Sequence, residues 1–181
     1  ENKKYVFKKI NKKIIIGAMG RLVEKKGFRN LINIFKKFNE IELHIAGDGP
    51  QMNVLRKNIK GYSNIKLLGW VDDKDKFFSK IDFFFSSSSI EPFGLVILEA
   101  MVRSTPVIST KCKGPLDIID HMSNGILISI DNVDEIKNSI KLLKSNNKLR
   151  KKISKNGFDT VKKRYSTKVY KKNFFSEIIK I

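Results

Sequence analysis

Two carboxylates, Glu91 and Glu99, are eight positions apart and flank a Phe93-Gly94 pair. The run 81–85 before them is apolar, with three consecutive phenylalanines, and it predicts a strand buried on both faces. Residues 95–101 have the composition of a helix. A strand, a polar turn and a helix N-terminus in this order predict an anion site, because unpaired backbone N–H groups and the helix dipole both point at the turn.

The spacing of the two carboxylates limits their chemistry. With a helix that begins near Phe93, a rise of ~1.5 Å per residue places Glu91 and Glu99 about 10–12 Å apart. A glycoside hydrolase needs its two carboxyl groups within roughly 5–9.5 Å of each other. The pair therefore does not suit a single glycosidic bond. It suits the two ends of one extended ligand, with a diphosphate between them over the helix N-terminus.

Six stretches within residues 13–165 are similar to the motifs of one enzyme family and occur in that family's order. They are Gly17 to Phe28 after the strand Ile14-Ile15-Ile16, Ala46-Gly47-Asp48-Gly49-Pro50, Leu67-Leu68-Gly69-Trp70-Val71, the stretch from Glu91 to Glu99, Thr105-Pro106-Val107-Ile108-Ser109, and Asn124-Gly125-Ile126-Leu127. Glu91 and Glu99 resemble the E-x7-E motif of the family 4 retaining glycosyltransferases. One such motif could arise by chance, whereas six in order rarely do.

The resemblance implies a sugar-nucleotide site at the ends of the strands. The basic residues of the family's first loop that correspond to Arg21 and Lys26 hold the diphosphate. An Arg offers a planar fork to phosphate oxygens and a Lys offers a mobile charge, so the chemistry suits this role. By the same resemblance, Glu99 accepts hydrogen bonds from the ribose hydroxyls, and Glu91 binds hydroxyls of the transferred sugar near its anomeric centre. The other expected donor contacts are Gly20, Phe93, Gly94 and Leu95, with Val71 beside the base.

The resemblance also implies transfer of a sugar, with retention, from a UDP- or GDP-linked donor, without a metal or other cofactor. The acceptor would be a saccharide or a lipid-linked molecule in bacterial envelope polysaccharide or lipopolysaccharide synthesis, bound by an N-terminal domain. This chain alone would then bind the donor but transfer sugar poorly. The alternative is a non-catalytic nucleotide-binding module of the same fold, which the intact carboxylate pair disfavours. A phosphorylase of this fold would need a pyridoxal-binding lysine region and a far longer chain.

Apolar runs near 13–18, 41–46, 64–68, 81–86, 105–109 and 126–129 predict strands, and helical patterns alternate with them. The alternation predicts an α/β fold, a Rossmann-like doubly wound parallel sheet of about six strands flanked by helices, with a helical C-terminal tail from about residue 147. Three parts are expected. Residues 1–12 are a basic lead-in from the N-terminal domain, 13–165 bind the sugar nucleotide, and 166–181 form a helix that packs on the N-terminal domain.

The formal net charge of +19 is carried mainly by the ends of the chain. Residues 1–13 carry a net +5 and residues 141–181 a net +12, whereas 14–140 carry only +2. Such ends favour contact with an anionic membrane, at about 1 kcal/mol per basic residue near the surface. An A+T-rich genome would produce the same excess, since 31 of the 37 basic residues are Lys. No nucleic-acid-binding pattern accompanies the charge, and the expected location is the cytoplasm, with peripheral contact at the inner membrane face.

Several positions depart from the family's pattern. Ser104 stands where a Gly is usual, at a helix end that prefers a positive φ, so a small strain is expected there. Lys111 and Lys113 occupy a loop that usually has Asp or small residues. Asp117 replaces a Glu at the expected start of the next helix. The two lysines beside Cys112 would lower its pKa, but without a catalytic partner in view a structural role is expected for this thiol.

Other residues that could bind a metal have simpler explanations. The cluster 72–75 contains a D-x-D pattern, which binds a metal in another glycosyltransferase fold, but Asp residues here fit the start of a helix. His44 lies in an expected strand and His121 near a helix end. Neither has a partner at the spacing of metal ligands. The sequence therefore predicts no metal site.

Overall fold

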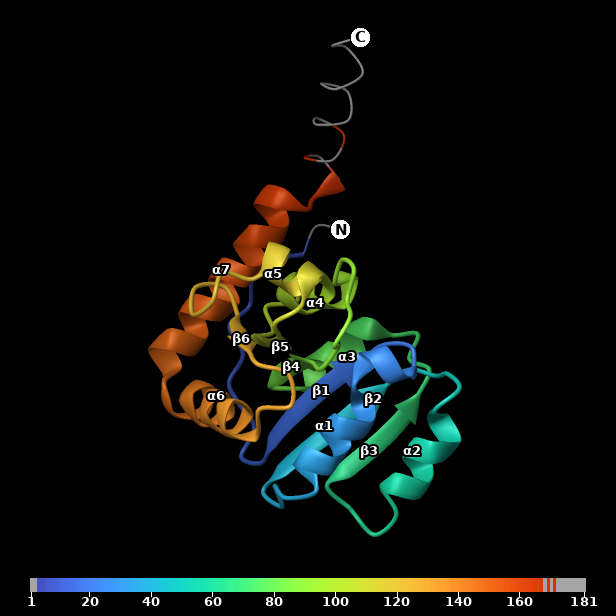
Figure 1. Ribbon diagram of the computed structural model, residues 1–181. Coiled ribbons are helices and arrows are strands. Elements are labelled where there is room, and N and C mark those ends of the chain that lie inside the picture. The colour runs from blue at the N-terminus through green and yellow to red at the C-terminus, as the bar shows by residue number, and fades with distance from the viewer. Residues whose placement is uncertain (1–2, 168, 170, 172–181) are drawn as a thin grey trace.

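Six parallel strands form one sheet in the computed structural model, which describes residues 3–167, 169 and 171 (Figure 1). The strands are β1 (Ile14–Met19), β2 (Ile41–Ala46), β3 (Ile65–Gly69), β4 (Phe83–Ser86), β5 (Val107–Thr110) and β6 (Ile126–Ile128). Their ends lie within two residues of the predicted ones, so the strand prediction is confirmed. The hydrogen-bonded order β3-β2-β1-β4-β5-β6 is that of a doubly wound sheet.

Helices cover both faces of the sheet, because each parallel connection must cross over it. One face carries α1 (Phe28–Phe35), α2 (Met52–Asn58) and α6 (Val133–Ser145), and the other carries α3 (Lys74–Lys80), α4 (Leu95–Met101) and α5 (Lys113–Ile118). The last helix, α7 (Asn147–Arg164), contacts both α4 and α6. The predicted helical tail is thus confirmed as far as Arg164. The expected helix over 166–181 lies almost entirely outside the described residues.

The three phenylalanines of β4 explain why this strand has no polar face. Phe85 belongs to the core under α1 and α6, where its ring centroid lies 6.4 Å from that of Phe35. Phe84 belongs to the opposite core and lies 5.6 Å from Phe78 of α3. Successive side chains of a strand point to opposite faces, so both must be apolar when both faces are covered. Each buried ring contributes about 1.5–3 kcal/mol.

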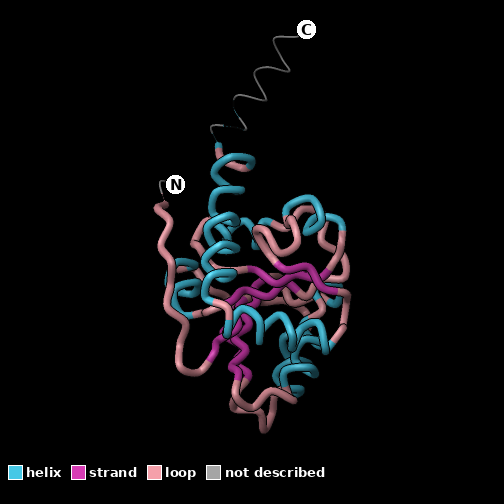
Figure 2. The backbone as a smooth tube through the Cα atoms, turned by 90° about the vertical axis from the view of Figure 1, so that its left-hand side faces the viewer, coloured by secondary structure: helices cyan, strands magenta, loops and turns pink. Residues whose placement is uncertain are grey.

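Residues 3–13 form neither helix nor strand and run alongside α7 (Figure 2). The ring of Tyr5 meets that of Phe158 edge to face, with centroids 5.9 Å apart. At the other end, the carboxylate of Asp82 accepts a hydrogen bond of 2.8 Å from the Asn11 backbone N–H. The described part of the predicted lead-in is therefore packed on this domain. We refer to residues 3–8 below as the N-terminal segment.

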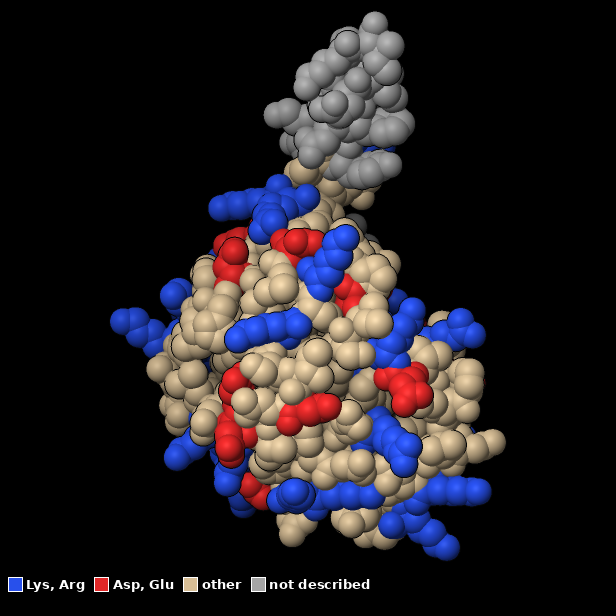
Figure 3. Space-filling model, in the orientation of Figure 1, with Lys and Arg blue, Asp and Glu red and all other residues tan. Residues whose placement is uncertain are grey.

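The positive charge is not gathered in one patch on the face shown in Figure 3. Lys and Arg side chains lie all round its outline, with acidic side chains among them. The net charge of +19 therefore marks no site by itself, and any site must be argued from local contacts. Within the described part of the chain, no helix has the length and apolarity needed to span a membrane.

Glu42 on β2 is the centre of a group of polar contacts that should make stability depend on pH. Its carboxylate lies 2.8 Å from the Lys66 ammonium and 2.9 Å from the His44 ring. Hydrogen bonds from Lys66 and then His44 lower the pKa of Glu42 from 4.5 to about 2. Because the folded state has the lower pKa, the stabilisation is complete above pH 4.5 and is lost as the pH falls toward 2.

Glu42→Gln should therefore lower the free energy of unfolding by about 0.5–1 kcal/mol at neutral pH, the range for partly exposed ion pairs. The difference between the two proteins should disappear as the pH falls from 4.5 to about 2. Urea denaturation across this range measures it. A difference that stays constant down to the lowest pH would contradict the assignment.

Candidate functional site

The predicted site residues follow β1, β3 and β4, and the parallel strands bring them to one edge of the sheet. β1 and β4 are hydrogen-bonded neighbours at its centre, with Ile16 opposite Phe83. From this pair the strand order runs to β3 on one side and to β6 on the other. The connections after β1 and β4 therefore diverge, and the crevice between them is where such sheets bind ligands.

Serines after β4 hold the loop that follows β1. This loop contains a short 3₁₀ helix, η1 (Glu24–Lys26). Ser87 Oγ donates to the Lys26 carbonyl at 2.7 Å, and Ser89 N donates to the Lys25 carbonyl at 2.9 Å. Gly27 allows the approach, since its φ is 69° and a Cβ there would lie 2.2 Å from the Ser87 carbonyl oxygen. No role was predicted for these serines from the sequence, although a polar run directly after a buried strand was the available signal.

Lys26 and Glu91 form an ion pair. Glu91 is only 8% exposed, and Ser88 Oγ lies 3.5 Å from the same carboxylate oxygen. Its backbone is fixed as well, because Gly114 N donates to the Glu91 carbonyl at 2.8 Å. The structure thus brings together two predicted site residues that are 65 positions apart in sequence. Desolvation of two charges offsets most of their attraction, so the pair adds little to stability.

The helix that carries Glu99 begins later than predicted. Instead of starting near Phe93, α4 starts at Leu95 and has Gly94 as its N-cap residue. The positive φ of Gly94, 96°, turns the chain away from the helical path, and helical bonding begins only with Ile97 N donating to the Gly94 carbonyl at 2.9 Å. The turn and the first amides of α4 nevertheless lie at the carboxyl edge, next to Glu91.

Glu99 has a partner that was not predicted from the sequence. Its Oε1 accepts a hydrogen bond of 2.7 Å from Lys74, the first residue of α3. Asp73 caps that helix by accepting from the Lys76 N–H at 2.8 Å, which confirms the predicted helix start within the acidic cluster. The other oxygen of Glu99, Oε2, is buried and accepts no hydrogen bond from the described residues. A buried carboxylate oxygen without a donor is costly, so Glu99 has capacity for one more donor.

The remaining predicted residues lie at the same edge. Gly20 is close to Lys26, since a Cβ on Gly20 would lie 3.7 Å from the Lys26 Cε. A Cβ on Gly47 would lie 1.9 Å from the Gly20 carbonyl oxygen, so the loops after β1 and β2 pack backbone on backbone. Arg21 is exposed, and its guanidinium has no hydrogen-bond or ion-pair partner within the described part of the chain. Val71 is partly buried against the core under α3 and α4.

The family model of the glycosyl transferases group 1 matches residues 1–160. The chain belongs to this family. It is 32% identical over 155 residues to the lipopolysaccharide core biosynthesis glycosyltransferase LpsE of Rhizobium meliloti, a match that covers 84% of this chain and 46% of LpsE. The chain thus spans about half the length of this curated relative. The resemblance deduced from the six motifs is confirmed.

Two solved structures show the same fold. TarM of Staphylococcus aureus is 27% identical with a TM-score of 0.83, and the match covers 96% of this chain and 37% of TarM. The C-terminal domain of the group 1 protein LpcC from Francisella tularensis is 28% identical with a TM-score of 0.73, covering 87% of this chain and 89% of that domain. The predicted Rossmann-like α/β architecture is therefore confirmed, and the chain corresponds to a C-terminal domain of this family.

Ser104, which departs from the glycosyltransferase pattern, has the positive φ expected at its position, 58°. The side chain is buried and makes a hydrogen bond that a glycine could not make. Its Oγ accepts a hydrogen bond of 3.1 Å from the Val6 N–H of the N-terminal segment, and its carbonyl accepts one of 2.9 Å from Ser154 of α7. Ser104 thus ties the N-terminal segment to the end of α4.

Two predictions in the nearby loop are wrong. Asp117 lies near the end of α5, because that helix begins four residues earlier, at Lys113. The lysines beside Cys112 do not lower its pKa. Burial raises the pKa of this thiol, and its Sγ lies 3.4 Å from the Ser88 carbonyl oxygen. Lys111 and Lys113 themselves are exposed.

Residues 3–167, 169 and 171 contain no group of three His, Cys, Asp or Glu side chains that could hold a metal ion. The Nε2 of His44 lies 2.9 Å from a carboxylate oxygen of Glu42. The Nδ1 of His121 accepts a hydrogen bond of 3.1 Å from the Leu127 N–H. That the glycosyltransferase needs no metal stays a prediction.

The contact between Gly27 and Ser87 can be tested by comparison with Gly61, which also has a positive φ, 87°, but has no atom within 4 Å of the position that a Cβ would take. Gly61→Ala should cost about 1–2 kcal/mol of unfolding free energy, from backbone strain alone. Gly27→Ala should cost about 3 kcal/mol or more, because its Cβ would also strike the Ser87 carbonyl. Urea denaturation measures both, and equal losses would contradict the proposed close packing.

Proposed function

We propose that this chain binds the nucleoside diphosphate sugar donor, UDP- or GDP-linked, of a retaining glycosyltransferase. The observation that carries the proposal is the contact between Lys26 and Glu91 next to the start of α4, with an unsatisfied carboxylate oxygen of Glu99 on that helix. A cation, a helix N-terminus and two separate carboxylates match a ligand with a diphosphate at its centre and hydroxyls at both ends.

The diphosphate would lie between the loop after β1 and the first turn of α4. An ammonium carries three N–H donors, so Lys26 can keep its contact with Glu91 and also donate to a phosphate oxygen. Arg21 supplies an exposed guanidinium without a competing partner among the described residues. Backbone N–H groups of Phe93, Gly94 and Leu95, and the close backbone at Gly20, would complete the phosphate contacts.

The hydroxyl-bearing ends of the donor would meet the two carboxylates. Glu99 Oε2, which accepts no hydrogen bond from the described residues, would accept one from a ribose hydroxyl. Glu91 would accept hydrogen bonds from hydroxyls of the transferred sugar, near the anomeric carbon of that sugar. Val71, in the loop after β3, is proposed to contact the base.

Transfer would occur on one face of the sugar. The bond between the anomeric carbon and the β-phosphate oxygen breaks while an acceptor hydroxyl oxygen bonds to that carbon. The hydroxyl proton passes to the leaving phosphate oxygen, and the nucleoside diphosphate departs. Arg21, Lys26 and the helix amides stabilise the charge that develops on this leaving group. No metal takes part in the proposed step.

Relatives support this assignment. TarM has been solved in complex with UDP, Fondaparinux and alpha-GlcNAc-glycerol, and LpsE is described as a lipopolysaccharide core biosynthesis enzyme. We therefore propose a saccharide or lipid-linked acceptor in bacterial envelope polysaccharide or lipopolysaccharide synthesis. Because the chain spans about half the length of LpsE, we propose that another part of the whole protein binds this acceptor.

Lys26→Ala and Arg21→Ala should each weaken UDP or GDP binding about 10- to 100-fold, the loss of one charge-assisted hydrogen bond. Lys25→Ala is the matched control, because it removes the same charge from the adjacent, exposed position. It should change the affinity by less than about 2-fold. Calorimetry with UDP, GDP and ADP on the parent chain and the three variants measures this.

Two results would refute the donor site. One is that none of the three nucleotides binds the parent more tightly than about millimolar. The other is that Lys25→Ala weakens binding as much as Lys26→Ala, because the loss of affinity would then follow from removing any positive charge in this loop. A non-catalytic nucleotide-binding module would show the same binding, and no observation on this chain favours it over the transferase.

A further inference from the structure

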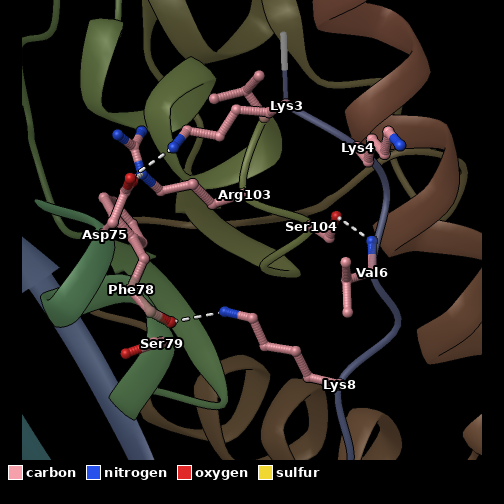
Figure 4. Close-up of a pocket in the computed structure, with 10 residues that line it drawn as sticks. Lys3, Lys4, Val6, Lys8, Asp75, Phe78, Ser79, Arg103 and Ser104 are labelled. Carbon is pink, nitrogen blue, oxygen red and sulfur yellow. Dashed lines mark hydrogen bonds and ion pairs between the residues drawn. The ribbon is translucent and has the colours of Figure 1, made fainter. Parts of the chain in front are cut away.

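A cavity of about 500 Å³ lies between the N-terminal segment, α3 and the end of α4 (Figure 4). Its lining includes four cations and one carboxylate: Lys3, Lys4, Lys8, Arg103 and Asp75. We call it the basic groove. None of the residues assigned to the donor lines it, so it is a separate site.

The single carboxylate of the basic groove is already neutralised. Asp75 Oδ2 lies 2.5 Å from Lys3 Nζ, and Oδ1 accepts a hydrogen bond of 2.6 Å from Arg103 Nε. These hydrogen bonds, from Lys3 and then Arg103, lower the pKa of Asp75 and keep it ionised. The charges of Lys4 and Lys8 remain, since neither forms an ion pair with a carboxylate of the described residues. The groove therefore has an uncompensated positive potential.

Lys8 is the most informative of these cations because it is partly buried and its ammonium donates hydrogen bonds only to neutral groups. Its ammonium donates to the Phe78 carbonyl at 2.6 Å and to Thr105 Oγ1 at 3.3 Å, and it extends from the N-terminal segment across the groove to α3 (Figure 4). Burial lowers the pKa of Lys8, and the charge of Arg103 lowers it further, against an opposing effect of Asp82. An ammonium has three N–H groups, so one remains for another acceptor.

Arg103 offers a second donor that is held in place. Its Nη1 donates to the Glu99 carbonyl at 3.0 Å, and its guanidinium lies 5.3 Å from the centroid of the Phe78 ring. With Nε on Asp75, the remaining nitrogen, Nη2, has no hydrogen-bond partner among the described residues. In Figure 4 the Arg103 guanidinium lies next to Asp75 and Lys3, whereas the Lys8 ammonium reaches the Phe78 carbonyl, so the groove offers cationic donors at two separate points. Guanidinium and ammonium groups both suit the oxygens of a phosphate group.

We infer that the basic groove binds a phosphate-bearing anion. Lys8, Lys4 and Arg103 supply the donors, and Ser104 keeps the N-terminal segment in position through its bond to Val6. The volume of about 500 Å³ exceeds that of a bare phosphate and leaves room for the group to which it is esterified. Two sources carry this chemistry, a soluble phosphate ester and the headgroup of an anionic lipid.

The test is an NMR titration of the ¹⁵N-labelled 181-residue chain with inorganic phosphate, at constant ionic strength and with saturating UDP to occupy the donor site. The amide signals of Val6, Ser79 and Ser104 should shift and saturate. Lys8→Gln and Lys4→Gln should each weaken phosphate binding by about 5-fold or more. Lys57→Gln, at an exposed position of α2, is the matched control and should change it by less than about 2-fold.

Lys8→Gln retains an amide donor for the Phe78 carbonyl, and Lys4 is exposed, so at least one groove variant should fold like the parent. Shifts that never saturate, or equal weakening by Lys57→Gln and the groove variants, would overturn the inference. Failure of UDP binding alone would refute the donor site and leave this site standing.

Co-sedimentation with phosphatidylglycerol and phosphatidylcholine vesicles then assigns the source. Phosphatidylglycerol binding that Lys8→Gln abolishes identifies a lipid headgroup, and binding that it leaves unchanged identifies a soluble ester.

Discussion

The candidate site depends on the pairing of β1 with β4 at the centre of the sheet. This pairing sets side by side the two loops that carry the cation and the carboxylate, although they are far apart in sequence. The loops then approach to backbone contact, which Gly27 permits and the Ser87 hydroxyl fixes. Lys26 reaches Glu91 only because of that approach. The chemistry of the crevice is thus a consequence of strand order and of one position without a side chain.

Helix α4 links the two sites of the molecule. Its N-terminus faces the crevice with Glu91, and Glu99 lies on its fifth position. Just beyond its end, Arg103 lines the basic groove and donates to the carbonyl of Glu99. The first turn of α3 has the same double role, since Lys74 pairs with Glu99 and Asp75 pairs with Arg103. A ligand in either site therefore contacts elements that shape the other.

Features of the fold that rest on local pattern could be predicted from the sequence. The phenylalanines of β4 predicted a strand buried on both faces, and the alternation of strand and helix patterns predicted the doubly wound sheet. Features that depend on contacts between distant segments could not be predicted. The partnership of Lys74 with Glu99 requires knowing how α3 lies against α4. The start of α4 was placed two residues early because composition does not reveal the positive φ of Gly94. The pKa of Cys112 follows burial, which its neighbours in sequence do not show.

The central claim is that the two carboxylates bind different ends of one sugar nucleotide, with Glu99 at the ribose. Calorimetry with UDP and 2′,3′-dideoxy-UDP, on the parent chain and on Glu99→Ala, tests it most directly. The parent should bind UDP about 10-fold more tightly, a difference of about 1.4 kcal/mol, and Glu99→Ala should bind the two nucleotides equally. If Glu99→Ala keeps the full preference for UDP, the ribose is held elsewhere and this account of the carboxylate pair is wrong.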